Sequence, residues 1–490
     1  MQSGLLSLSG RIGYFILPAM SKEEQRMNKL RQFPLLMLTL VFLISCADSV
    51  RYDNATTAEA QVKQQSKILP YPIHQQRLAN GLNVVTVPFD SPGTAAFYIV
   101  VRAGSRDEVE KGVTGFAHFF EHMMFRGTDK YPPEKYNAVL KSTGASANAN
   151  TSLDRTIYHM TGNVAKLDLM FEVEADRFRN LHYSEHDFKT EAGAVKGEYT
   201  KNYASPYRRL NEMMRNTAFD VHTYKHTTMG FFKDIVDMPN HFDYSLQYFK
   251  RFYRPEHCTI VVVGDVSAER VNRLAEKYFG SWERGNYVSR VPAEPPQEGT
   301  RYLHLQDGSI PPYFSLNYKG PAFNDETIDM PALDVLSQVL FSPTAPLYKK
   351  LVIDERKVRF LSGGAYDSRD PDLFSIEASL VDKADMQYVK NEIIKAIDDV
   401  KVNGVDKKVL ENIKSHLKYS FAMSIDNPDA IANSLAHYIY LTGDPESINR
   451  LYRQYDRVSV EDLEDVTRRY LVASGLTIAT ITDDAEGGLY

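Results

Sequence analysis

The chain has 490 residues, of which 43% are hydrophobic and 24% are charged. This length predicts about two to four domains, and the composition is ordinary for a soluble globular protein. The formal net charge of −6 gives no reason to expect a nucleic-acid partner. The two cysteines, Cys46 and Cys258, are too few for a disulfide framework.

The N-terminus predicts export from the cytoplasm. A basic segment at 27–33 precedes an apolar run at 34–46 that is short for a transmembrane helix. The sequence Leu-Ile-Ser-Cys at 43–46 resembles a bacterial lipobox, which predicts lipidation of Cys46. Residues 1–45 would then be an upstream extension plus signal peptide, with the true start at Met27, and residues 46–68 a tether. The alternative is a plain secretory signal in which Cys46 is incidental.

This interpretation predicts a bacterial envelope protein on the periplasmic side that contacts the membrane through its lipid anchor only. Ala47 follows the cysteine, and the absence of aspartate at that position favours the outer membrane.

The first half of the mature chain predicts a mixture of strands and helices. Segments rich in β-branched and aromatic residues predict strands, and apolar residues at helical spacing predict helices. The expected strands are 81–89, 95–104, 144–151, 154–161 and 259–266, and the expected helical stretches are 164–203, 207–219, 244–252 and 269–279. Cys258 opens an apolar run and is expected to be a buried strand residue.

The segment 114–127 contains His118, Glu121 and His122 among six phenylalanines and methionines. In a helix, residues four apart share a face, so His118 and His122 could bind one metal ion. Glu121 borders that face and could reach a water at the open coordination position. The alternative, two histidines placed by chance on a core helix, would bury three polar groups without a task.

A carboxylate is the usual third ligand of a hydrolytic zinc site. Glu191 and Glu198 are almost two helical turns apart and therefore share a face of their predicted helix. Residue chemistry alone leaves open which of them is the ligand, and an exposed, solvated glutamate is the ordinary alternative for both.

The second half is predicted to be a copy of the first. A proline-rich linker at 285–299 separates a domain at 69–284 from one at 300–490. Gly104 and Gly320 close similar strands 216 positions apart, and Tyr253 and Tyr470 precede similar strands 217 positions apart. This common offset indicates a duplicated unit.

The copy lacks the metal-binding side chains. The offset of 216 places Asp334, Ser337 and Gln338 at the positions of His118, Glu121 and His122, within a segment that is still apolar and helical. The fold prediction is therefore α+β, with two homologous domains, each a mainly antiparallel sheet with helices on one face, as the halves of a clamshell. The first would be the catalytic zinc-binding domain and the second the inactive duplicate.

The region 69–481 resembles the inverzincin metallopeptidases of the pitrilysin and mitochondrial-processing-peptidase type, in their two-domain bacterial form. The resemblance rests on the motif at 118–122, the pair Glu191 and Glu198, and the segment Asn148, Ala149, Asn150 and Thr151. It implies one Zn²⁺ per chain, held by His118, His122 and Glu198, with Glu121 as general base and Glu191 supporting the site. It also implies that residues 148–151 lie beside the cleft, where a peptide would bind as an added strand.

The expected activity is that of a zinc metalloendopeptidase acting on peptides or unfolded polypeptide segments. The alternative is a non-catalytic assembly or core-type subunit with the same fold; intact metal-site residues count against it. Family members that act alone carry an arginine and a tyrosine, six residues between, in the second half. The favoured register places Asp354 and Leu361 at the positions of this arginine and tyrosine. Arg359 and Tyr366 have the required spacing but lie about five residues further along the chain. We therefore expect a homodimer, or a heterodimer in which a zinc-lacking homologous partner supplies the pair.

Overall fold

The computed structural model describes residues 67–486 and 489, and the described residues from 68 onward form one compact unit. The predicted extension, signal peptide, Cys46 and tether up to residue 66 lie outside the described residues. Among the described residues, no helix has the length and apolar character required to cross a membrane.

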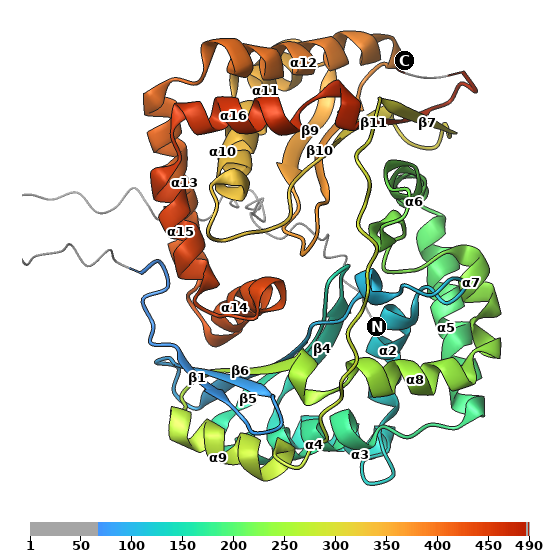
Figure 1. The fold of residues 1–490 in the computed structure, drawn as a ribbon, viewed down its shortest axis with the longest axis vertical. Coiled ribbons are helices and arrows are strands. Elements are labelled where there is room, and N and C mark those ends of the chain that lie inside the picture. The colour runs from blue at the N-terminus through green and yellow to red at the C-terminus, as the bar shows by residue number, and fades with distance from the viewer. Residues whose placement is uncertain (1–66, 487–488, 490) are drawn as a thin grey trace, which may run out of the picture. The chain divides into compact units, whose positions relative to one another are not determined.

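The first half is built on a six-stranded sheet (Figure 1). Its strands are β1 (His74–Arg77), β2 (Asn83–Pro88), β3 (Thr94–Val101), β4 (Ser146–Thr151), β5 (Thr156–Asn163) and β6 (Cys258–Gly264). Their order is β1-β2-β6-β3-β5-β4, and all neighbours except β2 and β6 run antiparallel. β4 is therefore an edge strand with one backbone edge free of sheet pairing.

The helices of this half are α2 (Phe116–Met123), α3 (Pro133–Thr143), α4 (Leu167–Asn180), α5 (Glu185–Tyr203), α6 (Pro206–Ala218), α7 (Phe232–Asp237), α8 (Phe242–Phe252) and α9 (Ala268–Phe279). The stretch expected to be helical at 164–203 contains two helices. Ser184 and Asp187 form a capping box that starts a new helix, because their side chains satisfy the free N–H groups of its first turn.

The second half repeats this plan with five strands. They are β7 (Arg301–Gln306), β8 (Tyr313–Lys319), β9 (Val358–Ala365), β10 (Leu373–Leu380) and β11 (Leu476–Thr482), in the order β7-β11-β8-β10-β9. Only β7 and β11 run parallel. Its helices are α10 (Asp329–Phe341), α11 (Pro346–Tyr348), α12 (Met386–Asn403), α13 (Lys407–Ser424), α14 (Pro428–Thr442), α15 (Ser447–Arg457) and α16 (Val460–Tyr470), with a π-helical turn at Lys349–Asp354. The predicted two-domain α+β fold is confirmed; the domain boundaries at 284 and 300 stay predictions.

In each half, one helix packs on the sheet of the other half, which the sequence analysis did not predict. α14 of the second half packs on β3 and β6 of the first sheet, and α6 of the first half packs on β7 and β11 of the second (Figure 1). Tyr98 on β3 donates a hydrogen bond of 2.8 Å to Asp429 on α14.

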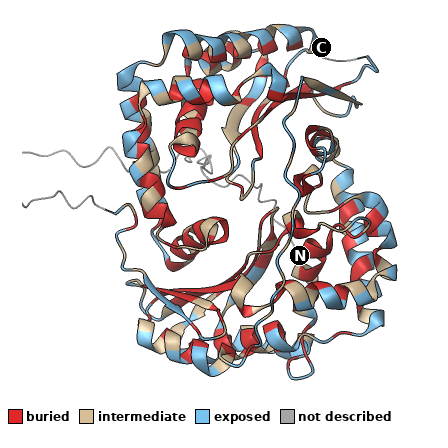
Figure 2. Cartoon of the chain, viewed as in Figure 1, coloured by how far each residue is buried: buried red, intermediate tan, exposed pale blue. Residues whose placement is uncertain are grey.

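This exchange explains the continuous apolar runs of the first sheet. Strands covered on both faces bury every side chain and lose the alternation of polar and apolar residues. All residues of β6 are buried, as are all residues of β3 after Thr94 (Figure 2). Cys258, the first residue of β6, is buried as expected.

The segment between the halves is irregular but fixed in place. The Glu294 carboxylate accepts hydrogen bonds from the backbone N–H groups of Asp220, Val221 and His222, at 2.7 to 3.0 Å. A second contact, a bidentate pair between Arg215 on α6 and Asp372 before β10 at 2.9 and 3.1 Å, also joins the halves.

Candidate metal centre

The motif segment forms α2, and buried carboxylates fix its N-terminal end. Glu108 accepts hydrogen bonds from the N–H groups of Gly115 at 2.8 Å and Ala117 at 2.7 Å. Asp234 accepts one from the Thr114 hydroxyl at 2.7 Å. These acceptors satisfy donors that a helix start leaves free. Burial raises the pKa of Glu108 to about 8, against the lowering effect of those backbone bonds.

The aromatic residues of the motif hold the helix from its other faces. Phe116, Phe119 and Phe120 are fully buried, and Phe120 stacks on Tyr248 of α8 with ring centroids 5.1 Å apart. A helix of eight residues is too short to be stable alone, so this packing and the two carboxylates determine where its histidines point.

His118, His122 and Glu198 converge on one point. The Glu198 Oε2 atom lies 3.3 Å from His122 Nε2 and 3.7 Å from His118 Nε2. One potential ligand atom from each of the three residues lies within 4.8 Å of the others, and no other such group of three occurs in the part of the chain that the structure describes. Tetrahedral zinc, with bonds of about 2.0 to 2.2 Å, fits between donors at this spacing. The residues present therefore fit a zinc ion.

The electrostatics of the three side chains also favour a cation. Burial lowers the pKa of His118, which keeps its ring neutral and its lone pair available. Burial would lower the pKa of His122 too, but hydrogen bonds with Glu191 and Glu198 raise it to about 9. The His122 hydrogen bond lowers the pKa of Glu198 to about 2. Two carboxylates thus demand positive charge at this point, which a divalent cation would supply.

Glu191 and Glu198 occupy different places around His122. Glu198 faces the two Nε2 atoms, whereas Glu191 lies 3.0 Å from His122 Nδ1. Glu191 is buried and accepts a hydrogen bond of 2.5 Å from Arg126 Nε. A carboxylate on Nδ1 fixes the ring orientation and directs the Nε2 lone pair toward the metal. Glu198, and not Glu191, therefore lies next to both Nε2 atoms, where a third ligand would be placed.

Glu121 lies beside this centre and is held by the edge strand. Its Oε2 atom accepts a hydrogen bond of 2.6 Å from the Thr151 hydroxyl at the end of β4. Glu121, His122, Arg126 and Glu191 line one cavity of about 390 Å³. Glu121 therefore borders a space that a water or a substrate could enter.

The predicted substrate-binding segment is most of the edge strand β4. Ala149 and Thr151 are buried toward the side of Glu121, while Asn148 is exposed and Asn150 is partly buried. Arg155 donates a hydrogen bond of 2.9 Å to the Asn150 carbonyl oxygen. The segment thus lies next to the general-base candidate, with its outer edge open to an added strand.

The second half holds no comparable centre among its described residues. Asp334, Ser337 and Gln338 lie on α10, where Tyr455 donates a hydrogen bond to Asp334 and Ser337 donates one of 2.7 Å to the Asp334 carbonyl. Asp354 and Leu361 occupy the positions at which the favoured register expects the arginine and tyrosine of the family. Leu361 is buried in the core and cannot reach a substrate, whereas Asp354 is exposed. Arg359 and Tyr366 are both exposed, near the start of β9 and just beyond its end.

Arg126, Glu108 and Asp234 were missed from the sequence. Arg126 lies eight residues after His118, on the turn that follows α2, so motif spacing could have suggested it. Nothing in the sequence pairs Glu108 or Asp234 with the start of α2.

Glu191→Gln should weaken zinc binding by about 10- to 100-fold, because the amide holds His122 Nδ1 less strongly and leaves Arg126 without its carboxylate. Competition with a chromophoric chelator measures the affinity. The matched control is Glu185→Gln, an exposed residue on the same helix, for which unchanged affinity is expected. Equal affinities of the two variants would remove Glu191 from its supporting role.

The chain consists of two repeated α+β halves. One half carries two imidazoles and a carboxylate that converge, with a further glutamate beside them. This combination is typical of zinc-dependent hydrolases. Comparison with known families gives the particular one. The profile of Insulinase (Peptidase family M16) matches residues 84–230, and that of Peptidase M16 inactive domain matches residues 243–417. The chain belongs to peptidase family M16.

Individual relatives agree with this assignment. The zinc protease PqqE of Helicobacter pylori is 28% identical over 408 residues, covering 80% of this chain and 89% of the relative. The mitochondrial-processing peptidase subunit beta of Caenorhabditis elegans is 25% identical, covering 88% and 94% of the two chains. The crystal structure of a protease from Helicobacter pylori superposes with a TM-score of 0.78 and 27% identity, covering 84% of this chain and 99% of that one.

Proposed function

We propose that the chain is a zinc metalloendopeptidase that hydrolyses peptides or unfolded polypeptide segments. The observation that carries this proposal is the convergence of His118, His122 and Glu198 beside Glu121. A family fold supplies only a scaffold, so the function rests on these side chains.

A zinc ion bound by His118, His122 and Glu198 would lower the pKa of a water molecule and polarise the scissile carbonyl. Glu121 accepts the proton of that water on the carboxylate oxygen that Thr151 does not hold. It then delivers the proton to the nitrogen of the leaving amine. No covalent intermediate is needed, because neither a serine nor a cysteine nucleophile takes part.

The substrate would add to the outer edge of β4. An extended peptide there exchanges hydrogen bonds with the outward-facing backbone groups of the segment Asn148, Ala149, Asn150 and Thr151, which belong to alternate residues, and it continues the sheet as another strand. The hydrogen bond from Thr151 to Glu121 places the general base at the end of that strand, where the scissile bond would lie.

A partner subunit is part of the proposal. A relative that covers nearly the whole chain is a subunit of a processing peptidase by name. We propose that a homodimer, or a heterodimer with a zinc-lacking homologue, supplies contacts equivalent to the arginine and tyrosine pair, unless Arg359 and Tyr366 serve. If a monomer in which Arg359 and Tyr366 are both replaced by alanine kept full activity, neither a partner subunit nor these two residues would be needed, and both alternatives would be wrong.

We also propose a location on the periplasmic side of a bacterial envelope, with a lipid on Cys46 and the outer membrane favoured. This rests on the sequence at 27–47 alone. Labelled palmitate should enter the wild-type chain and not Cys46→Ala.

The purified chain should contain one zinc ion and cleave internal bonds of a peptide library. Dialysis against a chelator should abolish cleavage, and added zinc should restore it, because the three ligands rebind the ion. Mass spectrometry of the products checks that cleavage is internal. A zinc-free chain, or one that cleaves nothing with or without a co-purifying partner, would favour a non-catalytic subunit.

A further inference from the structure

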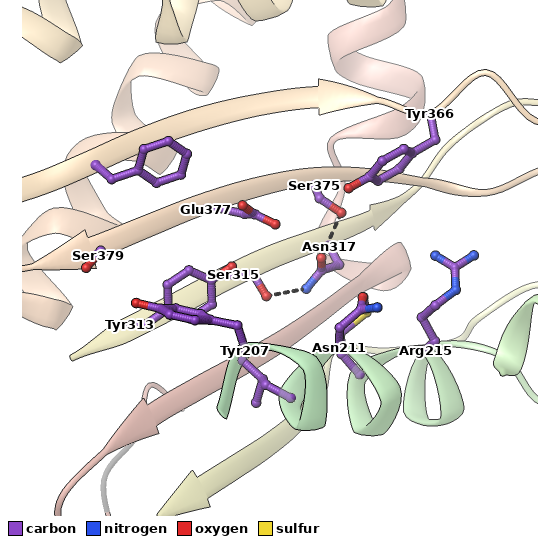
Figure 3. Close-up of a pocket in the computed structure, with 13 residues that line it drawn as sticks. Tyr207, Asn211, Arg215, Tyr313, Ser315, Asn317, Tyr366, Ser375, Glu377 and Ser379 are labelled. Carbon is purple, nitrogen blue, oxygen red and sulfur yellow. Dashed lines mark hydrogen bonds between the residues drawn. The ribbon is translucent and has the colours of Figure 1, made fainter. Parts of the chain in front are cut away.

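A second cavity, of about 480 Å³, lies between α6 and the second sheet (Figure 3). On one side Tyr207, Asn211 and Arg215 of α6 face it, and on the other side residues of β8 and β10 form its floor. Its size is within the range of sites that hold a side chain or a small ligand. The metal centre does not contribute to its lining.

The floor of this cavity is polar, which is unusual for the inner face of a sheet. Ser315 and Asn317 on β8 pair with Glu377 and Ser375 on β10, and all four point to the same side. Asn317 donates a hydrogen bond of 2.9 Å to Ser315 and accepts one of 2.8 Å from Ser375 (Figure 3). The corresponding face of the first sheet is apolar and covered by α14.

Helix α6 packs mainly on β7 and β11, and its Tyr207 contacts Tyr313 of β8, so a cavity is left over the polar residues of β8 and β10. A buried polar face lowers stability unless it has hydrogen-bonding partners or a ligand to bind. Ser315, Asn317 and Ser375 are hydrogen-bonded to one another, so the group of this floor that a charged ligand could serve is the Glu377 carboxylate.

Glu377 is the acidic residue of this floor. Among the described residues, no arginine, lysine or histidine forms an ion pair with its carboxylate. Arg215 lines the same cavity but is bound to Asp372 at 2.9 and 3.1 Å and to the Tyr224 carbonyl at 2.8 Å. Burial raises the pKa of Glu377, and the neighbouring Tyr313 hydroxyl lowers it. The carboxylate would gain from a cationic ligand.

Aromatic side chains surround the entrance. Tyr207, Phe360 and Tyr366 line the cavity and are 40%, 49% and 46% exposed. Tyr207 packs edge-on against Tyr313 with ring centroids 5.1 Å apart. Aromatic faces attract guanidinium and ammonium groups, and they also cover the aliphatic stems of arginine and lysine.

We propose that this cavity is a specificity subsite for an arginine or lysine side chain of the substrate peptide, with Glu377 as the residue that pairs with its charge. The inference rests on the proposed peptidase function and names the class of peptide that the chain prefers.

Chain geometry places the subsite within reach of the metal centre. Tyr207 follows Glu198 by nine residues, of which the first five steps are helical. The two Cα atoms can therefore lie at most roughly 20 Å apart, which an extended peptide spans with about six residues. A basic side chain that reaches Tyr207, which lines the same cavity as Glu377, would thus be within about six residues of the metal position.

Binding to a non-hydrolysing chain tests the subsite without requiring turnover. In the Glu121→Gln background, ten-residue peptides carry one arginine at successive positions, and each has a twin with citrulline, a neutral side chain of the same shape. For at least one position, the arginine peptide should bind about tenfold more tightly than its twin, as expected of one partly desolvated ion pair. Adding Glu377→Gln should abolish that preference and leave citrulline binding unchanged.

The control replaces another carboxylate of the same net charge. Glu283→Gln, at an exposed position away from the cavity, should keep the tenfold preference. Equal binding of every arginine and citrulline pair, a preference that survives Glu377→Gln, or no binding by any peptide would overturn the subsite. Wild-type cleavage of the same peptides separates the two proposals. Cleavage without a basic preference refutes only the subsite, whereas absence of cleavage both with and without a co-purifying partner refutes the peptidase function itself.

Discussion

Glu121→Gln should lower kcat for peptide hydrolysis by a factor on the order of 10³ while leaving the zinc content at one ion per chain. The reason is geometric. Glu121 is not among the three side chains that converge on the metal position, but it lies on the same helix as His118 and His122 and lines one cavity together with His122. The amide still accepts the hydrogen bond from Thr151, so its position is kept. It cannot accept the proton of the attacking water, and proton transfer of this kind contributes about 10² to 10⁴ to enzymatic rates.

Steady-state kinetics on one cleavable peptide, together with metal analysis of the same samples, checks this expectation. Glu134→Gln, in the first turn of α3, is the matched control and should retain both activity and zinc. A Glu121→Gln variant that hydrolyses peptides at the wild-type rate would remove Glu121 from the mechanism. A variant that loses zinc would instead make Glu121 a determinant of the metal site.

The architecture could be predicted from the sequence because its signals are local and repeated. The similar strand ends at Gly104 and Gly320 fall at the ends of equivalent strands, β3 and β8, of two sheets with the same pairing plan. Each strand carries its own pattern of β-branched and aromatic residues, so each can be recognised without knowledge of its neighbours. A duplicated order of elements then implies a duplicated fold.

The exchange of α6 and α14 could not be predicted in the same way. α6 is amphipathic and α14 is largely apolar, and such patterns show that a helix is buried without showing which sheet buries it. Tyr98 and Asp429 are 331 positions apart, and no local pattern connects them. The cavity beside α6 was missed for a related reason. Ser315, Asn317 and Glu377 look like ordinary polar residues until the register between β8 and β10 brings them together.

The metal centre could be predicted from the sequence only in part. The four-residue spacing of His118 and His122 fixes a shared helical face, so that pair follows from helix geometry alone. The choice between Glu191 and Glu198 required the position of α5 against α2, which only tertiary packing determines. Family resemblance pointed to Glu198, and the distances of 3.3 and 3.7 Å from its Oε2 atom to the imidazoles agree.

His122→Ala should leave the chain folded, without zinc and without hydrolysis. Removal of His122 deletes one of three protein ligands and also frees Glu191 from the hydrogen bond at Nδ1. Glu191 keeps its hydrogen bond from Arg126, so His118 and Glu198 are the two ligands that remain at the metal position. Zinc affinity should therefore fall by at least about a hundredfold, at or beyond the upper end of the loss expected of Glu191→Gln. The zinc content after dialysis should approach zero.

The comparison variant is His182→Ala, an exposed histidine near Asp129 on the surface. It should keep one zinc ion and full activity, because its ring contributes to neither the metal centre nor either cavity. Thermal unfolding followed by circular dichroism separates loss of metal from loss of fold. The buried phenylalanines of α2 and the carboxylates of Glu108 and Asp234 do not depend on His122, so the helix should persist. If His122→Ala kept its zinc, the ion would have to be held elsewhere, and the assignment of His118, His122 and Glu198 as ligands would be wrong.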